Sequence, residues 1–177
     1  MKEVKEKKKE VVVLTLFSVF IVILSMSEWA YIPVSDNMFL DLSVIPAVIA
    51  FLVGGWRAGM GVAMVWTVTG FVTGPIPPDS LFWPTLIIKM TFAFVTWKSY
   101  DIAKKIRPGS PDCMYVAVLV GQFIRWFMTL GTFSLIRGVN YFVNEWMYIW
   151  MALETILCLA GLYLFVKRLR KVHVTSR

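Results

Sequence analysis

The chain has 177 residues, of which 58% are hydrophobic and only 16% are charged, and its mean hydropathy is +0.70. Soluble domains average about 45–50% apolar and roughly 25% charged residues, so the composition excludes a soluble globular enzyme, a disordered chain and a disulfide-stapled secreted protein. The net charge of +7 is gathered in clusters beside apolar segments, which indicates cytoplasmic loops in contact with membrane lipid and no nucleic-acid partner.

The first half of the chain contains three apolar segments. A basic segment, residues 1–10, precedes the first apolar segment at residues 11–27. An outer, lid-like loop of residues 29–40 follows. The second and third apolar segments, residues 42–56 and 58–73, are separated only by a tight turn at Arg57. The third is rich in small residues, which suits close packing between helices.

The second half contains three more apolar segments, and Pro and Gly residues between 74 and 79 precede them. The fourth segment spans residues 81–98, and a charged cytoplasmic linker of residues 98–112 follows it. The fifth and sixth segments span residues 113–136 and 146–166. A basic tail, residues 167–177, closes the chain.

The distribution of positive charge predicts the topology. With both termini inside, fifteen of the eighteen Lys and Arg residues fall in cytoplasmic segments, and only Arg137 falls in an outer loop. Such a bias sets the orientation of membrane proteins. We therefore predict a single all-α membrane domain of six transmembrane helices, with N and C termini cytoplasmic, in the plasma membrane of a prokaryote.

Three ionisable residues lie near the middle of predicted spans: Lys89, Arg125 and Glu154. A charge at this depth costs at least ~2.5 kcal/mol, so such residues face the interior of the bundle and are paired or functional. One alternative is a purely structural salt bridge between Glu154 and either cation. The other alternative is a ligand pocket: one carboxylate cannot fully neutralise two cations, and the remaining positive charge is what a site for an anionic or carbonyl-rich ligand would need.

Aromatic and polar residues accompany these charges at helical spacing. Flat aromatic side chains beside hydrogen-bonding groups suit a planar ring ligand. Asn140 and Asn144 in the outer loop either contact this ligand or cap the sixth helix. The other candidate substrate-binding residues on the three helices are Phe82, Gln122, Trp146 and Trp150.

The sequence contains no catalytic or nucleotide-binding signature, and its only histidine is His173 in the basic tail. Cys113 and Cys158 lie in apolar stretches without metal-ligand spacing, so we interpret both as packing residues. We expect no enzymatic activity, no metal and no cofactor. Energy for uphill transport would have to come from a partner or an ion gradient.

One stretch of sequence carries a family resemblance. Asp41-Leu42-Ser43-Val44-Ile45-Pro46-Ala47 and the following turn at Gly54–Gly59 resemble the riboflavin-type S-components of energy-coupling factor (ECF) vitamin transporters. Tyr31 lies where the Pro-containing outer loop of that family would be. The chain departs from the family pattern at Gly55, where Pro is usual, and the first helix has no Ala-x-x-x-Ala motif.

The resemblance implies a membrane-embedded substrate-binding subunit whose outer loop closes over a vitamin-like ligand, with Tyr31 and Asp41 among the binding residues. It also implies an ECF scaffold subunit in the membrane and two cytoplasmic ATPase subunits as partners. Riboflavin is the first expected ligand, followed by thiamin or another pyrimidine and by pantothenate. The alternatives are a stand-alone ion-coupled carrier or channel and a ligand-free membrane scaffold.

Overall fold

A computed structural model of the chain describes residues 2–27, 30–35, 38–73, 82–137 and 145–175. These ranges are almost entirely helical, which confirms the expected all-α class. They contain α1 Lys2–Ser25, β1 Tyr31–Ser35, β2 Met38–Asp41, α2 Val44–Thr73, α3 Phe82–Ile106, α4 Asp112–Arg137 and α5 Glu145–Thr175.

The described ranges contain five helices where the sequence predicts six, because residues 42–56 and 58–73 belong to one element. α2 consists of two helices joined through a kink at Gly55, which has φ 80° and ψ 179°. A positive φ costs glycine nothing, so the chain changes direction there without a separate loop. The change of direction expected at Arg57 therefore occurs at Gly55.

The outer loop is more ordered than the sequence suggests. Its described part forms an antiparallel β-hairpin in which Tyr31 lies opposite Asp41 and Ile32 opposite Leu40. The backbone of Leu42 also donates a hydrogen bond to the carbonyl of Ala30, 2.9 Å away. The two strands are short, and polar and proline residues interrupt the alternation of apolar and polar side chains that would indicate a strand in the sequence.

Three helices continue beyond the expected spans into charged sequence. α1 includes the basic N-terminal segment, α3 continues through most of the linker to Ile106, and α5 extends into the basic tail. Lys and Glu are good helix formers, so a helix persists outside its apolar part until a breaker stops it. At α3 this breaker is Pro108-Gly109, where Gly109 has φ 82°.

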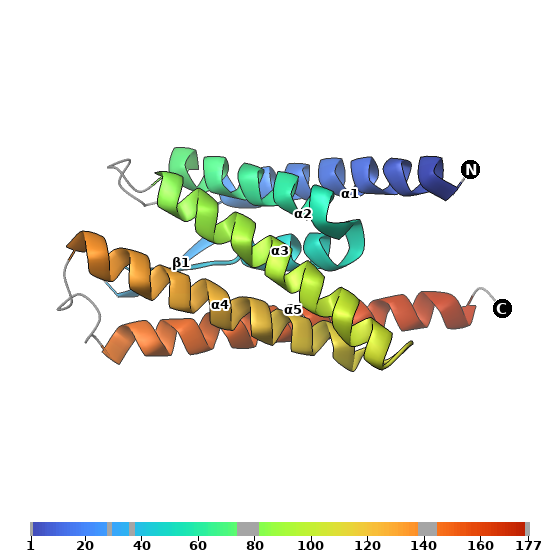
Figure 1. Cartoon of the computed structure of the whole chain (residues 1–177). Helices are drawn as coiled ribbons and strands as arrows, with labels where there is room; N and C mark the ends of the chain where they lie inside the picture. Colours follow the sequence, from blue (N-terminus) through green and yellow to red (C-terminus); the bar gives the residue numbers. More distant parts are fainter. Residues whose placement is uncertain (1, 28–29, 36–37, 74–81, 138–144, 176–177) are drawn as a thin grey trace.

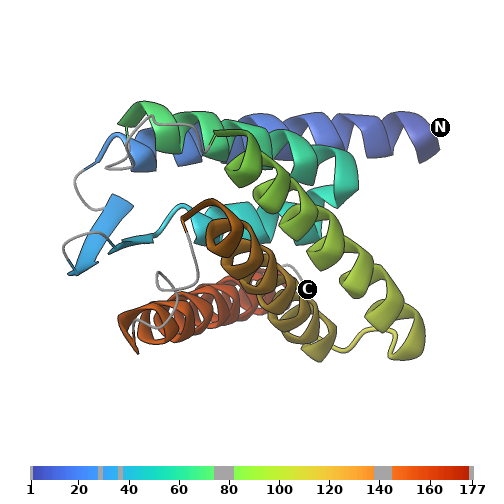
Figure 2. The same ribbon diagram turned by 60° about the vertical axis from the view of Figure 1, so that its left-hand side comes forward.

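The helices lie side by side, with the hairpin at one end of the bundle and both termini at the other (Figures 1 and 2). α2 packs against α1 and α3, and α3 packs against α4. Close approach of α1 to the second half of α2 uses glycine: a Cβ at Gly61 would lie 2.6 Å from Cδ1 of Leu14. The expected close packing by small residues is thus present at this contact.

The centre of the core is aromatic. Trp66 on α2 and Phe92 on α3 are fully buried, and Phe51 meets Phe92 edge to face with ring centroids 5.5 Å apart. Both expected packing cysteines, Cys113 and Cys158, are buried free thiols. By length and composition, two of the described helical segments, Val44–Thr73 and Asp112–Ile136, are apolar enough to cross a membrane.

Replacing Gly55 by alanine tests the kink. An L-residue at φ 80° is strained, so Gly55→Ala should lower the free energy of unfolding by ~1–2 kcal/mol. Gly131→Ala is the matched control, because no other part of the described chain comes within 4 Å of a Cβ there, apart from the neighbouring residues and backbone of its own helix. It should leave stability unchanged or raise it by up to ~1 kcal/mol. Thermal unfolding in detergent measures both, and equal melting temperatures for the two variants would contradict the assignment.

Candidate functional site

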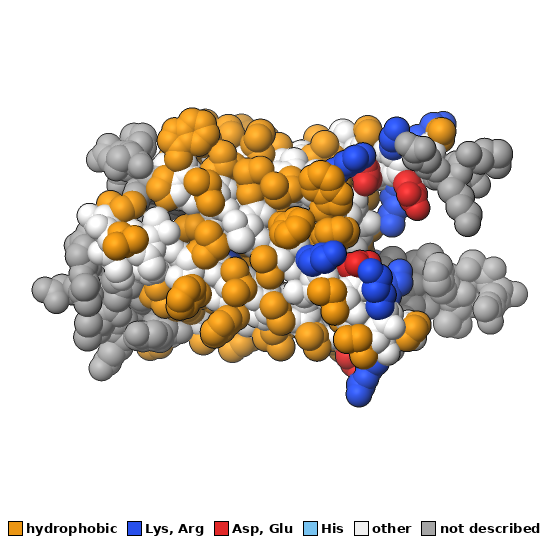
Figure 3. Space-filling model, viewed as in Figure 1, with side chains coloured by type: hydrophobic (Ala, Val, Ile, Leu, Met, Phe, Trp, Pro, Cys, Tyr) orange, Lys and Arg blue, Asp and Glu red, His pale blue; other side chains and the backbone are white. Residues whose placement is uncertain are grey.

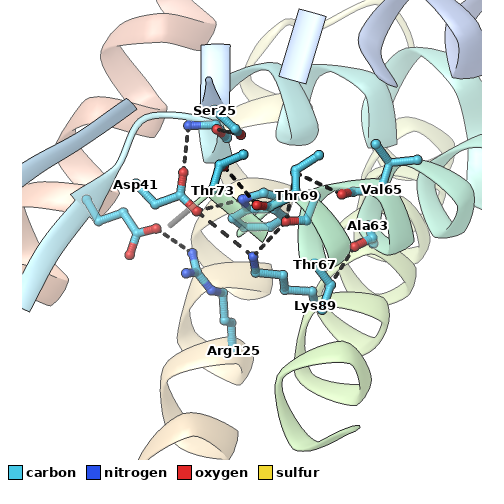
Figure 4. A network of polar contacts seen from close by, with 12 residues as sticks. Ser25, Asp41, Ala63, Val65, Thr67, Thr69, Thr73, Lys89 and Arg125 are labelled. Atoms are coloured by element: carbon cyan, nitrogen blue, oxygen red, sulfur yellow. Dashed lines mark hydrogen bonds and ion pairs between the residues drawn. The ribbon is translucent and has the colours of Figure 1, made fainter. Parts of the chain in front are cut away.

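Four charged side chains from four elements meet inside the bundle, and we call them the buried charge cluster (Figure 4). They are Asp41 of β2, Lys89 of α3, Arg125 of α4 and Glu154 of α5. Their side chains are 16%, 8%, 8% and 1% exposed, respectively. Such burial is tolerated only when each charge has an opposite charge and hydrogen bonds nearby.

Asp41 connects the hairpin to α2. Its Oδ2 accepts a 2.7 Å hydrogen bond from the indole Nε1 of Trp66, and its Oδ1 accepts one of 2.9 Å from the backbone N of Ser43. The second bond satisfies a backbone donor just before the first turn of α2, which is the role of a helix cap. One carboxylate therefore caps the helix and holds the hairpin against it.

Lys89 lies against the same tryptophan. Its Nζ donates to the backbone carbonyl of Trp66 at 3.3 Å and lies 3.9 Å from the centroid of the indole ring. Oδ2 of Asp41 is also 3.9 Å from Nζ. Gly70 lies next to this group: a Cβ there would be 3.7 Å from Nζ, in ordinary van der Waals contact. The ammonium is thus held by a carbonyl, an aromatic face and a carboxylate.

Arg125 and Glu154 form the second pair. Nη1 of Arg125 donates to Oε1 of Glu154 at 2.7 Å, a short, charge-assisted hydrogen bond. Gln122 supports the pair, because its Oε1 lies 3.5 Å from the same nitrogen and its Nε2 donates to Sγ of Cys158 at 3.0 Å. The pairing that the sequence left open for Glu154 is therefore with Arg125.

Trp66 links the two pairs. The Arg125 guanidinium carbon lies 5.2 Å from the centroid of its ring, and Lys89 approaches the same ring at 3.9 Å. The guanidinium also lies 5.4 Å from the ring of Phe92 and 4.9 Å from that of Trp126. Electrostatic attraction between cations and ring faces adds to the ion pairs. Trp66 was not among the expected site residues; its one signal in the sequence is an indole N–H within an apolar segment, which needs a hydrogen-bond acceptor.

The cluster is electrically balanced, which corrects one expectation. The sequence suggested one carboxylate for two cations, with positive charge left over for an anionic ligand. The second carboxylate is Asp41, which lies between the expected outer loop and the second apolar segment and which the hairpin carries into the bundle. Two acids and two bases therefore leave no net charge among the four residues.

Tyr31 lies beside the cluster, directly across the hairpin from Asp41. A Cβ at Gly70 would lie 3.6 Å from its hydroxyl oxygen and 3.7 Å from Nζ of Lys89. Burial raises the pKa of the Tyr31 hydroxyl, and the negative charge of Asp41 raises that pKa further. The hydroxyl thus stays neutral and protonated at physiological pH.

The structure brings together Tyr31, Asp41, Lys89, Gln122, Arg125 and Glu154 of the expected site. Phe82 is not part of this group: it lies at the start of α3, and its ring contacts Phe71 and Trp83 at 5.2 and 5.3 Å. Asn140 and Asn144, and the side chains of Trp146 and Trp150, lie outside the described residues.

One carboxylate oxygen in the cluster has spare hydrogen-bonding capacity. Oε2 of Glu154 is buried and has no hydrogen-bond partner among the described residues. In contrast, the hydroxyls of Thr67, Thr69 and Thr73 donate to carbonyls of their own helix (Figure 4). A buried acceptor without a partner costs about 1–3 kcal/mol, so this oxygen is suited to a donor from a bound molecule.

Comparison with known proteins adds no relative. No family model, no curated protein and no solved structure matches the chain.

The Arg125–Glu154 pair can be tested by a double-mutant cycle. Arg125→Met or Glu154→Met leaves one buried charge unpaired and should cost ~3–5 kcal/mol of stability, whereas the double variant should lie much closer to the wild type. Lys105→Met is the control, because it breaks the exposed Lys105–Asp101 pair and should barely move the melting temperature. Additive losses in the double variant would show that the two side chains are not coupled.

The Asp41–Trp66 hydrogen bond can be tested by hydrogen exchange. Trp66→Phe keeps the aromatic ring but removes the donor, a loss of about 1.5–3 kcal/mol for a bond to a charged group. Peptides covering residues 30–42 should then exchange at least tenfold faster by mass spectrometry. Trp97→Phe, at the far part of α3, should leave these peptides unchanged. If hairpin exchange is the same in both variants, the bond does not hold the hairpin.

Proposed function

We propose that the chain is a membrane-embedded subunit that binds a vitamin-like small molecule beneath its hairpin and delivers it to an ATP-driven ECF module. The observation that carries this proposal is the hairpin held by Asp41 over a buried charge cluster. A segment fastened by a few polar contacts can release and close again, as entry to a buried binding site requires. The resemblance at residues 41–47 and 54–59 begins at Asp41, the last residue of the hairpin, and includes the kink of α2.

The surface supports membrane embedding. Large apolar side chains are exposed on every helix, for example Leu16 at 63%, Met64 at 49%, Ile87 at 57%, Phe123 at 71% and Leu164 at 62%. Apolar side chains cover the middle of the molecule, while Lys, Arg, Asp and Glu gather at one end (Figure 3). Soluble proteins rarely expose apolar surface in this way. A protein with buried, paired charges and an exposed apolar surface is suited to a lipid environment.

The proposed orientation places both termini in the cytoplasm of a prokaryotic cell. Both ends of the chain lie at the same end of the bundle, which also carries the basic residues (Figures 1 and 3). Retention of positive charge on the cytoplasmic side then puts the hairpin on the outer face. The kinked α2, with α1, α3, α4 and α5, would make up the multi-pass domain.

The chemistry of the cluster favours a neutral ligand with an N–H donor. Since the four charges balance, a ligand carboxylate would add an unpaired charge, which disfavours pantothenate. Riboflavin has an uncharged ring system with an imide N–H that could donate to Oε2 of Glu154. It therefore remains the first candidate, and thiamin, with an aminopyrimidine donor but a positive charge, comes second.

A stand-alone ion-coupled carrier is the second candidate. It is favoured by the continuity of the cluster, in which Trp66 contacts Asp41 and Lys89 of one pair and Arg125 of the other. Buried ionisable groups of this kind form ion or proton pathways in many transporters. The two functions differ in what the purified chain does alone: a binding subunit holds ligand without transport, and a carrier transports.

The first experiment identifies the molecule that co-purifies with the chain expressed alone and extracted in detergent. Mass spectrometry and an absorbance spectrum should reveal a stoichiometric vitamin-like compound, which is yellow if it is a flavin. The chain reconstituted alone in liposomes should not accumulate it. A preparation that is folded, empty and unable to bind riboflavin, thiamin or pantothenate would overturn the proposal. Proton-dependent uptake by the single chain would establish the carrier instead.

The role of Glu154 is tested on the ligand so identified. Glu154→Gln keeps the shape but removes the negative acceptor, and affinity should fall at least tenfold, as expected for a hydrogen bond to a charged group. Asp101→Asn, an exposed acid paired with Lys105, is the control and should bind normally. Fluorescence titration measures both, and unchanged affinity in the Glu154 variant would assign Glu154 to structure alone.

A further inference from the structure

Aromatic and basic side chains form adjacent pairs on three helices. In each pair the cation lies within 6 Å of the centroid of the aromatic ring, the range of attraction between a cation and a ring face. The pairs are Arg57 on Trp56 at 5.3 Å, Lys98 on Trp97 at 5.7 Å and Lys167 on Tyr163 at 5.8 Å.

The three pairs lie toward the end of the bundle that carries the termini. One is at the kink of α2, next to Gly55, where a Cβ would lie 4.0 Å from Nε1 of Trp97. The third is on the part of α5 that leads to the C-terminus (Figure 1). All three basic residues are exposed, as are Trp56 and Tyr163. Figure 3 shows where the apolar surface gives way to charge at this end.

The spacing along the helices agrees with a membrane interface at the pairs. Nine residues separate Lys89 from Lys98, and nine separate Trp66 from Arg57. At 1.5 Å per residue each interval is about 14 Å. Half of the ~30 Å hydrocarbon layer is about 15 Å. If the buried charge cluster lies at mid-depth, these pairs therefore lie where the lipid headgroups begin.

We propose that Trp56–Arg57, Trp97–Lys98 and Tyr163–Lys167 form a collar that binds the phosphates of anionic phospholipids in the leaflet facing the termini. The aromatic rings lie at the level of the acyl-chain boundary, and the bases reach outward to the phosphates. The nearby acid Asp101 forms its ion pair with Lys105 at 2.9 Å. Anionic lipid supplies the matching charge. The proposal rests on the membrane embedding described under the proposed function.

The test uses the detergent-purified full chain titrated with phosphatidylglycerol or phosphatidylcholine, with bound lipids counted by native mass spectrometry. The collar variant is Arg57→Gln/Lys98→Gln/Lys167→Gln. Its matched control, Lys8→Gln/Lys9→Gln/Lys104→Gln, removes the same charge from exposed lysines outside the three pairs. A third variant, Trp56→Leu/Trp97→Leu/Tyr163→Leu, keeps every charge and removes the rings.

We expect phosphatidylglycerol to bind the wild type at least fivefold more tightly than phosphatidylcholine. This preference should disappear in the collar variant, weaken in the ring variant and persist in the control. If the collar and control variants lose this lipid preference equally, the preference depends only on net charge, and the proposal is overturned. So would a wild type without lipid preference.

Resistance to carbonate extraction from cell membranes separates this proposal from the one on which it rests. A wild type released by carbonate is not membrane-embedded, so both proposals would fail. A wild type retained in the membrane but without lipid preference would overturn the collar alone. Melting temperatures of the variants identify any that do not fold, and single substitutions then replace the triple one.

Discussion

Charges can be buried in an apolar bundle only as balanced, hydrogen-bonded sets, and this constraint relates the elements of the structure to one another. β2, α3, α4 and α5 each contribute one charge, and α2 contributes Trp66, which contacts members of both pairs. Removing any one of the four charges leaves another without compensation. Hairpin and helices are thus positioned by a shared electrostatic requirement, in addition to the aromatic core around Phe51 and Phe92.

This arrangement combines an apolar core that contains a few buried charges with a surface that is also apolar. The interior contains two acids and two bases, whereas large apolar side chains are exposed on every helix. In water, such a surface favours aggregation; in lipid, it is the solvated surface. The hairpin contributes to this interior although its two strands are short. Its paired backbone groups are satisfied, and it delivers an acid to an interior that would otherwise carry excess positive charge.

Periodicity and charge placement predicted much of this arrangement. Lys89, Arg125 and Glu154 could be recognised as inward-facing because a charge in a long apolar segment has few other options. The partner of Lys89 could not be found, because Asp41 lies outside the apolar segments and its contact depends on a hairpin with little sequence signal. The helix count differed because Gly55 allows a change of direction within α2. Only three-dimensional packing places Trp66 between two cations.

The position of Asp41 couples the hairpin to the start of α2. Its two oxygens serve two elements at once: one accepts the indole N–H that fastens the hairpin, and the other accepts the backbone N–H of Ser43 at the start of α2. A carboxylate that swings away with the hairpin also gives up the backbone N–H of Ser43, directly before α2. Opening the hairpin and loosening the start of α2 are thus coupled, and the hydrogen bond to Ser43 favours the closed hairpin.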